Sequence, residues 1–351
     1  MPLTVALDAR LFTRSMTGDT SYWRGLIRAL IPISADVRLL LYSNSPKPAE
    51  IPESSNVVWI QLEGADRWWS LVRFPLAARK AGARVIHTQY NLSPLAGRNG
   101  VTTFHDVSFF IGPEWFRPKD RFLLRWQVPA SARRAAKIIA VSQTCKEEIE
   151  RFVPAAVGKV EVTYNALGEN ITPMAITEAR ETVQELGVPD DYLLTVGTQW
   201  PRKNMGLAIE SARLAGRNIV VTGKTGWGGQ PVGPIYPGYV TDRQLTALYQ
   251  CAGLYLAPSF HEGFGIPLLE AFACSCPVLC SAGGALPEVA GGAAEVMSSF
   301  EPSAWTERIK SLLADSSKLQ HMRQLGVERV KCFDWATTAR QTLDIYREAA
   351  K

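Results

Sequence analysis

The sequence predicts an α/β protein made of two doubly wound, Rossmann-like domains that face a central cleft. Short apolar segments alternate with helical segments along most of the chain, and this alternation is typical of parallel sheets covered by helices on both faces. The alternating series occurs twice, with a break near residues 165–180. The chain has 351 residues, which is enough for two domains of ordinary size.

The first series predicts an N-terminal domain over residues 1–168. Short apolar runs indicate strands, and apolar residues three or four positions apart indicate helices. Ser142 or Thr144 is expected to cap a helix that carries acidic residues in its first turns. Strands are expected within 3–12, 37–43, 56–62, 83–91, 101–109 and the first part of 136–153, and helices within 20–30 and the rest of 136–153.

The second series predicts a C-terminal domain over residues 169–334. It contains the same two kinds of segment in alternation, and a further helical segment, 335–351, follows both series. Strands are expected within 192–198, 218–224, 254–260, 277–282 and the end of 285–297, and helices within 203–216, 242–253, after residue 265, within 285–297 and within 335–350.

A glycine-containing turn is expected where the strand at 254–260 ends. Gly263 and Gly265 allow the backbone to approach a ligand closely, and Pro267 suits the first position of the following helix. Free N–H groups at a helix start attract phosphate, and ligands of open α/β sheets bind at the carboxyl ends of the strands. The residues predicted to bind the anion are Gly263, Phe264, Gly265 and Ile266.

Two glutamates flank this turn in "HEGFGIPLLEAF", residues 261–272. A carboxylate repels phosphate but accepts hydrogen bonds from a pair of hydroxyls. Glu270, about one turn into the helix, is therefore expected to hold a ribose. Glu262, before the turn, is expected to hold a sugar attached to the far phosphate. Two acids around an anion site describe a nucleotide diphosphate sugar.

A basic pair is expected at the start of the helix at 203–216. Arg202 and Lys203 follow the first strand of the second domain, and cations at a helix start oppose the helix dipole. This unfavourable placement indicates that a ligand such as a diphosphate offsets the charge. A solvated basic turn is the alternative.

Two residues of the first domain are also candidates. His105 ends the strand at 101–109, where a histidine could bond a hydroxyl or move a proton. Gly18, in the loop after the first strand, could let backbone N–H groups approach a phosphate. A structural histidine and an ordinary loop are the alternatives.

With these residues in view, the chain resembles the retaining glycosyltransferases of family 4, which have the GT-B fold. "SFHEGFGIPLLEAFACSCPVLCS" is similar to the E-x7-E signature of that family, and "FHDVSFF", "LLTVGTQWPRKN" and "ALPEVAGGAA" are supporting matches. The resemblance covers nearly the whole chain. This chain differs from the family in the first-domain loop, which carries fewer glycines than that loop usually has in the family.

The resemblance implies a role for each candidate. Glu270 would bind the ribose, Glu262 the sugar hydroxyls, Arg202 and Lys203 the diphosphate, and His105 would lie near the transferred sugar. The last helix would cross back to the first domain. Donor binding would also involve Gly18 and the region of Tyr239 and Val240, which reads the base.

The implied reaction is transfer of a hexose with retention from a nucleotide diphosphate sugar to a hydroxyl of a saccharide or lipid-linked saccharide, in lipopolysaccharide or exopolysaccharide assembly. GDP-mannose is the first donor expected, with UDP-glucose or a rhamnosyl donor as alternatives. No cofactor or metal is expected, because no Asp-x-Asp occurs. The residues also admit a glycoside hydrolase or a sugar-nucleotide-binding protein, whereas an NAD enzyme is disfavoured because no G-x-G-x-x-G follows the first strand.

The charge distribution predicts an anionic partner for the first half of the chain. Residues 1–170 carry 22 Lys and Arg against 15 Asp and Glu. The segments "DRWWSLVRF" and "DRFLLRWQ" mix aromatic and basic residues, as interfacial segments do, although core packing of the aromatics is the alternative. No signal peptide or spanning segment is evident. A cytoplasmic protein is predicted, with possible contact of its N-terminal domain with the inner face of the membrane and no nucleic-acid partner.

Overall fold

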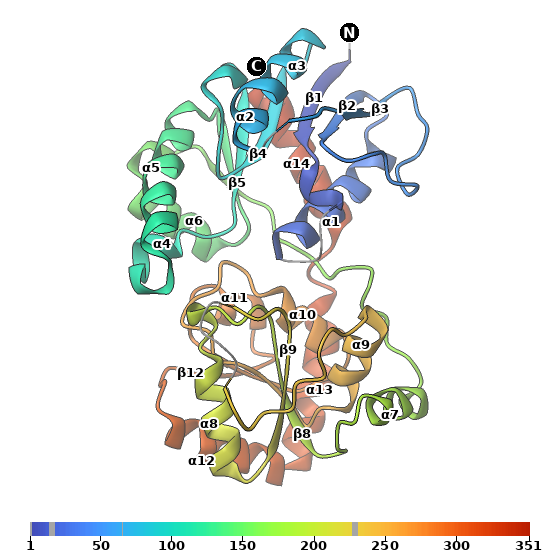
Figure 1. Ribbon diagram of the computed structural model, residues 1–351, viewed down its shortest axis with the longest axis vertical. Helices are drawn as coiled ribbons and strands as arrows, with labels where there is room; N and C mark the ends of the chain where they lie inside the picture. Colours follow the sequence, from blue (N-terminus) through green and yellow to red (C-terminus); the bar gives the residue numbers. More distant parts are fainter. Residues whose placement is uncertain (1, 14–17, 65, 227–230) are drawn as a thin grey trace. The chain divides into compact units, whose positions relative to one another are not determined.

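The computed structural model describes residues 2–13, 18–64, 66–226 and 231–351, and the chain divides into two compact units (Figure 1). Unit 1 comprises the chain up to Asn165 together with Asp334–Lys351, and unit 2 comprises Ala166–Phe333. The division lies three residues before the predicted boundary at 168/169. The final helix is counted with unit 1, although it follows unit 2 in the sequence.

Unit 1 is built on a parallel sheet of seven strands in the order β3-β2-β1-β4-β5-β6-β7. The inner strands are almost fully buried, as expected for a sheet covered on both faces. The strands are β1 Leu3–Asp8, β2 Val37–Ser43, β3 Val57–Gln61, β4 Val85–Gln89, β5 Gly100–Phe104, β6 Lys137–Ala140 and β7 Val160–Val162. The helices of four or more residues are η1 Arg10–Thr13, α1 Gly18–Ile33, η2 Trp69–Arg73, α3 Phe74–Lys80, α4 Ser108–Ile111, α5 Pro118–Arg134, α6 Gln143–Phe152 and α14 Trp335–Ala349.

The C-terminal helix α14 packs on α1 inside unit 1. A Cβ atom on Gly25 of α1 would lie only 2.1 Å from the Trp335 ring, so the absence of a side chain there admits the indole. At the other end of α14, the hydroxyl of Tyr346 lies 2.6 Å from Nδ1 of His87 in β4. The helix that follows the second series in the sequence therefore completes the core of the first.

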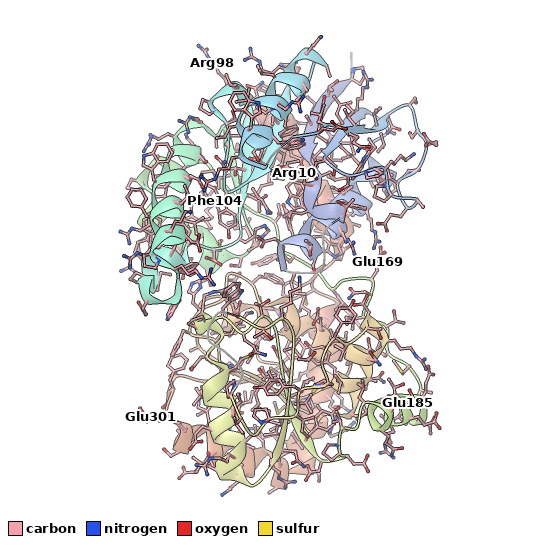
Figure 2. All side chains as sticks on the ribbon, viewed as in Figure 1. Arg10, Arg98, Phe104, Glu169, Glu185 and Glu301 are labelled. Atoms are coloured by element: carbon pink, nitrogen blue, oxygen red, sulfur yellow. The ribbon has the colours of Figure 1, made fainter. Side chains whose placement is uncertain are left out.

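Residues after β1 show how local contacts fix the end of a strand in unit 1. The guanidinium of Arg10, a residue labelled in Figure 2, donates hydrogen bonds to the carboxylate of Asp8 at 2.9 and 2.6 Å and to Oγ of Ser70 at 2.7 Å. Its guanidinium lies 4.1 Å from the centroid of the Trp69 ring. Trp69 is fully buried, so this tryptophan of "DRWWSLVRF" belongs to the core.

Unit 2 is built on a parallel sheet of five strands in the order β12-β11-β10-β8-β9. Its strands are β8 Tyr192–Val196, β9 Asn218–Thr222, β10 Leu254–Ala257, β11 Val278–Ser281 and β12 Glu295–Met297. Its α-helices are α7 Ile176–Glu185, α8 Met205–Ala215, α9 Asp242–Cys251, α10 Ile266–Ala273, α11 Leu286–Ala290, α12 Pro302–Ala314 and α13 Ser316–Val330. The short helix η6, Pro201–Lys203, precedes α8.

The strand order of unit 2 reverses direction between β8 and β10. The chain passes from β8 to β9 on one side of β8 and then returns to β10 on the other side. Such a switch point is where open α/β sheets bind ligands. Among the described residues, no helix is both long and apolar enough to cross a lipid bilayer.

Candidate active site

A tight turn connects the carboxyl end of β10 to α10 at the switch point of unit 2. Gly265 precedes the helix with φ of 100°, a backbone conformation that L side chains rarely adopt. A Cβ atom there would also lie 2.8 Å from Cδ2 of Leu286. Pro267 is the second helical residue, not the first as predicted, because Ile266 already begins α10.

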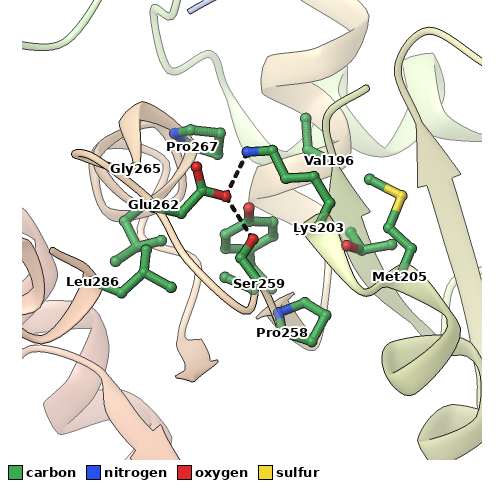
Figure 3. Close-up of a pocket in the computed structure, with 13 residues that line it drawn as sticks. Val196, Lys203, Met205, Pro258, Ser259, Glu262, Gly265, Pro267 and Leu286 are labelled. Carbon is green, nitrogen blue, oxygen red and sulfur yellow. Dashed lines mark hydrogen bonds and ion pairs between the residues drawn. The ribbon is translucent and has the colours of Figure 1, made fainter. Parts of the chain in front are cut away.

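Glu262, just before this turn, is the centre of a charged cluster (Figure 3). Its Oε1 accepts hydrogen bonds from Nζ of Lys203 at 2.6 Å and from Oγ of Ser259 at 2.5 Å. Its Oε2 accepts a bond from Nη1 of Arg202 at 3.1 Å. Only 7% of Glu262 is exposed. The loops after β8 and β10 thus form one compact ionic site.

This cluster corrects the expectation that a ligand is needed to offset the basic pair. Glu262 of the same chain already offsets the charges of Arg202 and Lys203. Burial by itself raises the pKa of Glu262, but the two cations outweigh burial and lower that pKa to about 2. Glu262 is therefore a carboxylate at neutral pH, and it can accept hydrogen bonds but has no proton to donate.

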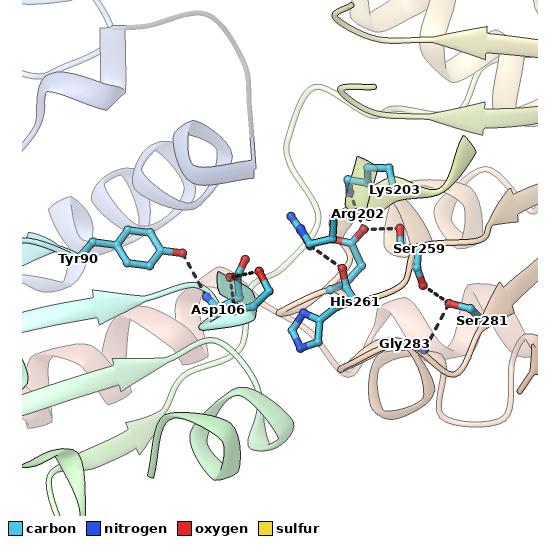
Figure 4. A network of polar contacts seen from close by, with 10 residues as sticks. Tyr90, Asp106, Arg202, Lys203, Ser259, His261, Ser281 and Gly283 are labelled. Atoms are coloured by element: carbon cyan, nitrogen blue, oxygen red, sulfur yellow. Dashed lines mark hydrogen bonds and ion pairs between the residues drawn. The ribbon is translucent and has the colours of Figure 1, made fainter. Parts of the chain in front are cut away.

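Hydrogen bonds to backbone carbonyl groups hold the cluster in place, and Figure 4 shows the one that the side chain of Arg202 makes with His261. The amide of Phe260 donates to the carbonyl oxygen of Arg202 at 2.8 Å, and Nη1 of Arg202 donates to the carbonyl oxygen of His261 at 2.5 Å. The amide of Ala285 donates to the carbonyl oxygen of Glu262 at 2.8 Å. Glu262 is thus supported from the loops that follow β8 and β11 as well as from its own loop.

Glu270, in the second turn of α10, is in a different electrostatic setting. Its Oε2 accepts a hydrogen bond from the hydroxyl of Tyr249 in α9 at 2.9 Å. Burial raises the pKa of Glu270 to about 7, although the Tyr249 bond and the charge of Lys203 act in the opposite direction. The two glutamates therefore differ in charge state. Glu262 is fully ionised near neutral pH, whereas Glu270 gains and loses its proton in that range.

A pocket opens at the ends of β8 and β10, and three of the predicted site residues line it: Lys203, Glu262 and Gly265. Tyr239 and Val240 are not among its lining residues, and 94% of Tyr239 is exposed. Phe264 and Ile266 are buried beside the turn. The pocket is lined by Thr195, Val196, Lys203, Met205, Tyr255, Ala257, Pro258, Ser259, Glu262, Gly265, Pro267, Leu268 and Leu286.

The two candidates of the first domain lie in unit 1. His105 follows β5 directly, is 9% exposed, and has Nε2 2.9 Å from Oε1 of Gln89. Gly18 is the first residue of α1. Met16 and Thr17, which precede it in the predicted phosphate-binding loop, lie outside the described residues.

Comparison with known proteins identifies the chain. The protein-family model described as Glycosyltransferase Family 4 matches residues 17–167, and the family model described as Glycosyl transferases group 1 matches residues 233–329. O-antigen chain mannosyltransferase B of Escherichia coli is 31% identical over 266 residues, which cover 70% of each chain. The chain belongs to the family 4 glycosyltransferases.

Solved structures show the same fold for this glycosyltransferase. Sucrose-phosphate synthase of Thermosynechococcus elongatus matches 99% of this chain and 98% of its own, with a TM-score of 0.79 and 20% identity. Anabaena HepE, solved in complex with UDP and glucose, matches 98% and 99%, with a TM-score of 0.70 and 18% identity. The expected GT-B fold is confirmed. The enzyme is a hexosyltransferase. This excludes the two alternatives that the sequence left open, a glycoside hydrolase and a sugar-nucleotide-binding protein.

Three polar contacts in this glycosyltransferase were not predicted from its sequence. Ser259 bonds Glu262, Tyr249 bonds Glu270, and Gln89 bonds His105. Ser259 lies three positions before Glu262, and that proximity was a usable signal. Tyr249 and Gln89 reach their partners from other helices and strands, and nothing in the local sequence pattern points to either contact.

Proposed function

We propose that this glycosyltransferase moves a mannosyl group from GDP-mannose to a hydroxyl of a saccharide acceptor, with retention and without a metal ion. The observation that carries the proposal is the cluster of Glu262, Arg202 and Lys203 beside the start of α10. It combines cations that suit a diphosphate with a permanent carboxylate that suits sugar hydroxyls.

The relatives support the choice of donor. The Escherichia coli relative is named as an O-antigen chain mannosyltransferase, which favours mannose and an acceptor in surface-polysaccharide assembly. The Anabaena structure contains UDP and glucose, which favours a nucleotide diphosphate sugar in the same fold. GDP is our first choice of nucleotide, and UDP-glucose and a rhamnosyl donor are the competitors to be tested against it.

In the proposed reaction, the bond between the anomeric carbon and the diphosphate oxygen breaks, and the acceptor oxygen bonds the same face of that carbon. The acceptor proton passes to the departing phosphate oxygen. Arg202, Lys203 and the positive end of α10 stabilise the charge that develops on the diphosphate. Glu262 orients the two cations and accepts hydrogen bonds from the sugar hydroxyls. These fixed charges are suited to take the place of a metal ion.

Donor choice and metal independence are tested together. GDP-mannose is expected to raise the Tm of the purified enzyme more than UDP-glucose or a rhamnosyl nucleotide, because a ligand that binds only the folded state stabilises it. Transfer from GDP-mannose to an alkyl mannoside, followed by mass spectrometry and by NMR of the new anomeric centre, is expected to continue in excess chelator. Transfer from another donor alone would contradict the mannosyl assignment. Activity lost in chelator and restored by one particular metal would contradict the metal-free mechanism.

We further propose that α5 contacts an anionic membrane surface. Phe122 and Trp126 are 76% and 65% exposed and lie one turn apart, with exposed Lys119 and Arg133 at positions that share their face. An aromatic centre between basic ends suits the interface of an anionic bilayer. It would place the enzyme at the inner face of the cell membrane, where a lipid-linked acceptor is within reach.

Liposome sedimentation tests this contact. The wild type is expected to bind vesicles that contain anionic lipid at low salt and to dissociate at high salt, because the attraction is screened. Replacing both Phe122 and Trp126 with serine is expected to weaken binding about 10-fold or more, through loss of apolar burial. Val157→Ser changes another exposed apolar residue of unit 1, 61% exposed, and serves as the control. Equal binding by all three proteins would reject α5 as the contact.

A further inference from the structure

The side chain of Gln89, at the end of β4, lies between a ring nitrogen of Trp23 and a ring nitrogen of His105. Its Oε1 accepts a hydrogen bond from Nε1 of Trp23 at 2.9 Å and lies 2.9 Å from Nε2 of His105. Because β4 and β5 are adjacent parallel strands, with Gln89 opposite Thr103, the ends of the two strands bring Gln89 and His105 together.

The indole of Trp23 determines which way the Gln89 amide points. An indole N–H is a donor only, so the group that faces it must be the amide oxygen and not the amide nitrogen. Trp23 is fully buried, and turning the amide over would leave its N–H facing another donor. The same oxygen therefore faces His105, and a hydrogen bond at that distance requires the proton to be on Nε2 of the imidazole.

The surroundings of His105 favour the same arrangement. The carboxylate of Asp19 lies 4.0 Å from Nε2, on the side where the proton is placed. The rings of Tyr22 and Tyr90 pack against the imidazole, with centroids 4.9 and 5.8 Å from it. In the part of the chain that the structure describes, no hydrogen bond reaches Nδ1.

The backbone at Tyr90 adds a second constraint on the strand end that carries His105. Tyr90 has φ of 55°, a left-handed conformation that is uncommon for a residue with a side chain. In that conformation its hydroxyl accepts a hydrogen bond from the amide of Asp106 at 3.1 Å (Figure 4). Strained residues of this kind persist where neighbouring contacts hold them. Gln89 and Tyr90 thus support consecutive residues, His105 and Asp106.

We propose that Gln89, oriented by Trp23, is a positioning residue that holds His105 as the Nε2–H tautomer. Nδ1 is then the ring atom that accepts a hydrogen bond from a hydroxyl of the sugar substrates. The assignment of the tautomer depends on unit 1 alone, whereas the use of Nδ1 in transfer rests on the proposed function.

NMR of the enzyme labelled with ¹⁵N-histidine tests the tautomer directly. The chain has four histidines, and the loss of signals in His105→Asn assigns those of His105. At a pH where the ring is neutral, Nε2 is expected to show the shift of a protonated ring nitrogen and Nδ1 that of an unprotonated one. The opposite pattern would overturn the proposal, whether or not the enzyme transfers mannose.

Two variants of Gln89 separate positioning from packing. Gln89→Glu keeps an oxygen that accepts from both Trp23 and His105, so the Nε2–H tautomer is expected to persist. Gln89→Leu removes the acceptor, so a mixture of tautomers and a fall in kcat of about 3- to 10-fold are expected, which corresponds to one lost neutral hydrogen bond. Gln61→Leu, at an exposed glutamine of β3 in the same unit, is the matched control.

The outcomes distinguish this inference from the proposed function. A pure Nε2–H tautomer in Gln89→Leu would show that Gln89 does not set it and would overturn the proposal. The Nε2–H tautomer in the wild type and a mixture in Gln89→Leu support the positioning role even if GDP-mannose proves not to be the donor. In that case only the proposed donor would be wrong, and the thermal-shift and transfer measurements test the donor separately.

Discussion

Replacing Glu262 with glutamine is expected to lower kcat by about 10- to 200-fold and to change the KM for the donor little. A hydrogen bond to a charged group contributes roughly 1.5–3 kcal/mol, which corresponds to that range of rates. The effect falls on kcat because positive charge develops on the sugar in the transition state, and a carboxylate there interacts with it more strongly than with the ground state.

The cluster around Glu262 adds an expectation for nucleotide binding. In the wild type, Glu262 pairs with Arg202 and Lys203, and under the proposed function the diphosphate binds the same two cations. Glutamine removes the competing negative charge, so the affinity for GDP is expected to stay the same or to rise. Calorimetric titration measures it. A fall in GDP affinity as large as the fall in kcat would show that Glu262 acts on the nucleotide and not on the sugar.

The same variant is expected to change acid stability. A carboxyl group whose pKa is lower in the folded than in the unfolded state stabilises the fold above its unfolded pKa, and this stabilisation is lost as the pH falls through its folded pKa. For Glu262 the unfolded pKa is near 4.5 and the folded pKa is about 2. The stability difference between the wild type and Glu262→Gln should therefore shrink over that window. Glu185→Gln makes the same chemical change at an exposed residue at the end of α7 (Figure 2) and should leave kinetics and stability unchanged.

Glu270→Gln is expected to fail differently, by raising the KM for the donor by about 10- to 200-fold with little change in kcat. The magnitude again follows from the loss of hydrogen bonds to a charged acceptor. Because a ribose would be held equally in the ground and transition states, its loss affects binding and not the chemical step. GDP alone should lose affinity in this variant, in contrast to Glu262→Gln.

The raised pKa of Glu270 makes this prediction dependent on pH. The ionised carboxyl accepts a hydrogen bond from a hydroxyl on each of its oxygens, and more strongly than the protonated form does. Burial raises the pKa of Glu270 to about 7. At pH 6 about a tenth of the enzyme would be competent, so donor affinity should be about 10-fold weaker than well above pH 7. The donor affinity of Glu270→Gln should not depend on pH in this range. The difference in donor affinity between this variant and the wild type should therefore narrow as the pH falls.

The measurement uses GDP-mannose, because its diphosphate gains no proton in this range, whereas the terminal phosphate of GDP does. Glu185→Gln should keep the pH profile of the wild type. A wild-type affinity that is flat from pH 6 to pH 8 would contradict a role for ionised Glu270. Unchanged kinetics in both glutamate variants would remove the turn between β10 and α10, with its two flanking glutamates, as the site of transfer.

Local sequence determined much of the fold and the position of the candidate site. The period of the apolar residues indicated the alternating strands and helices, because burial of one face is a local requirement of each element. Glycine at 265 and proline at 267 indicated the turn and the helix start after β10, because glycine permits a backbone conformation that other residues avoid and proline fixes the φ angle of its own residue. The E-x7-E spacing pointed to the family that the comparisons then established.

Tertiary structure alone decided which side chains meet and how they are charged. Lys203 and Glu262 are 59 residues apart in sequence and meet because β8 and β10 pair as parallel neighbours. Gln89 meets His105 for the same reason in the sheet of unit 1. Trp68 and Trp69 are adjacent in sequence, yet one is 62% exposed and the other is buried. The opposite pKa shifts of Glu262 and Glu270 depend on burial and on the distance to cations, and both are set by strand pairing between distant segments and not by the spacing of residues along the chain.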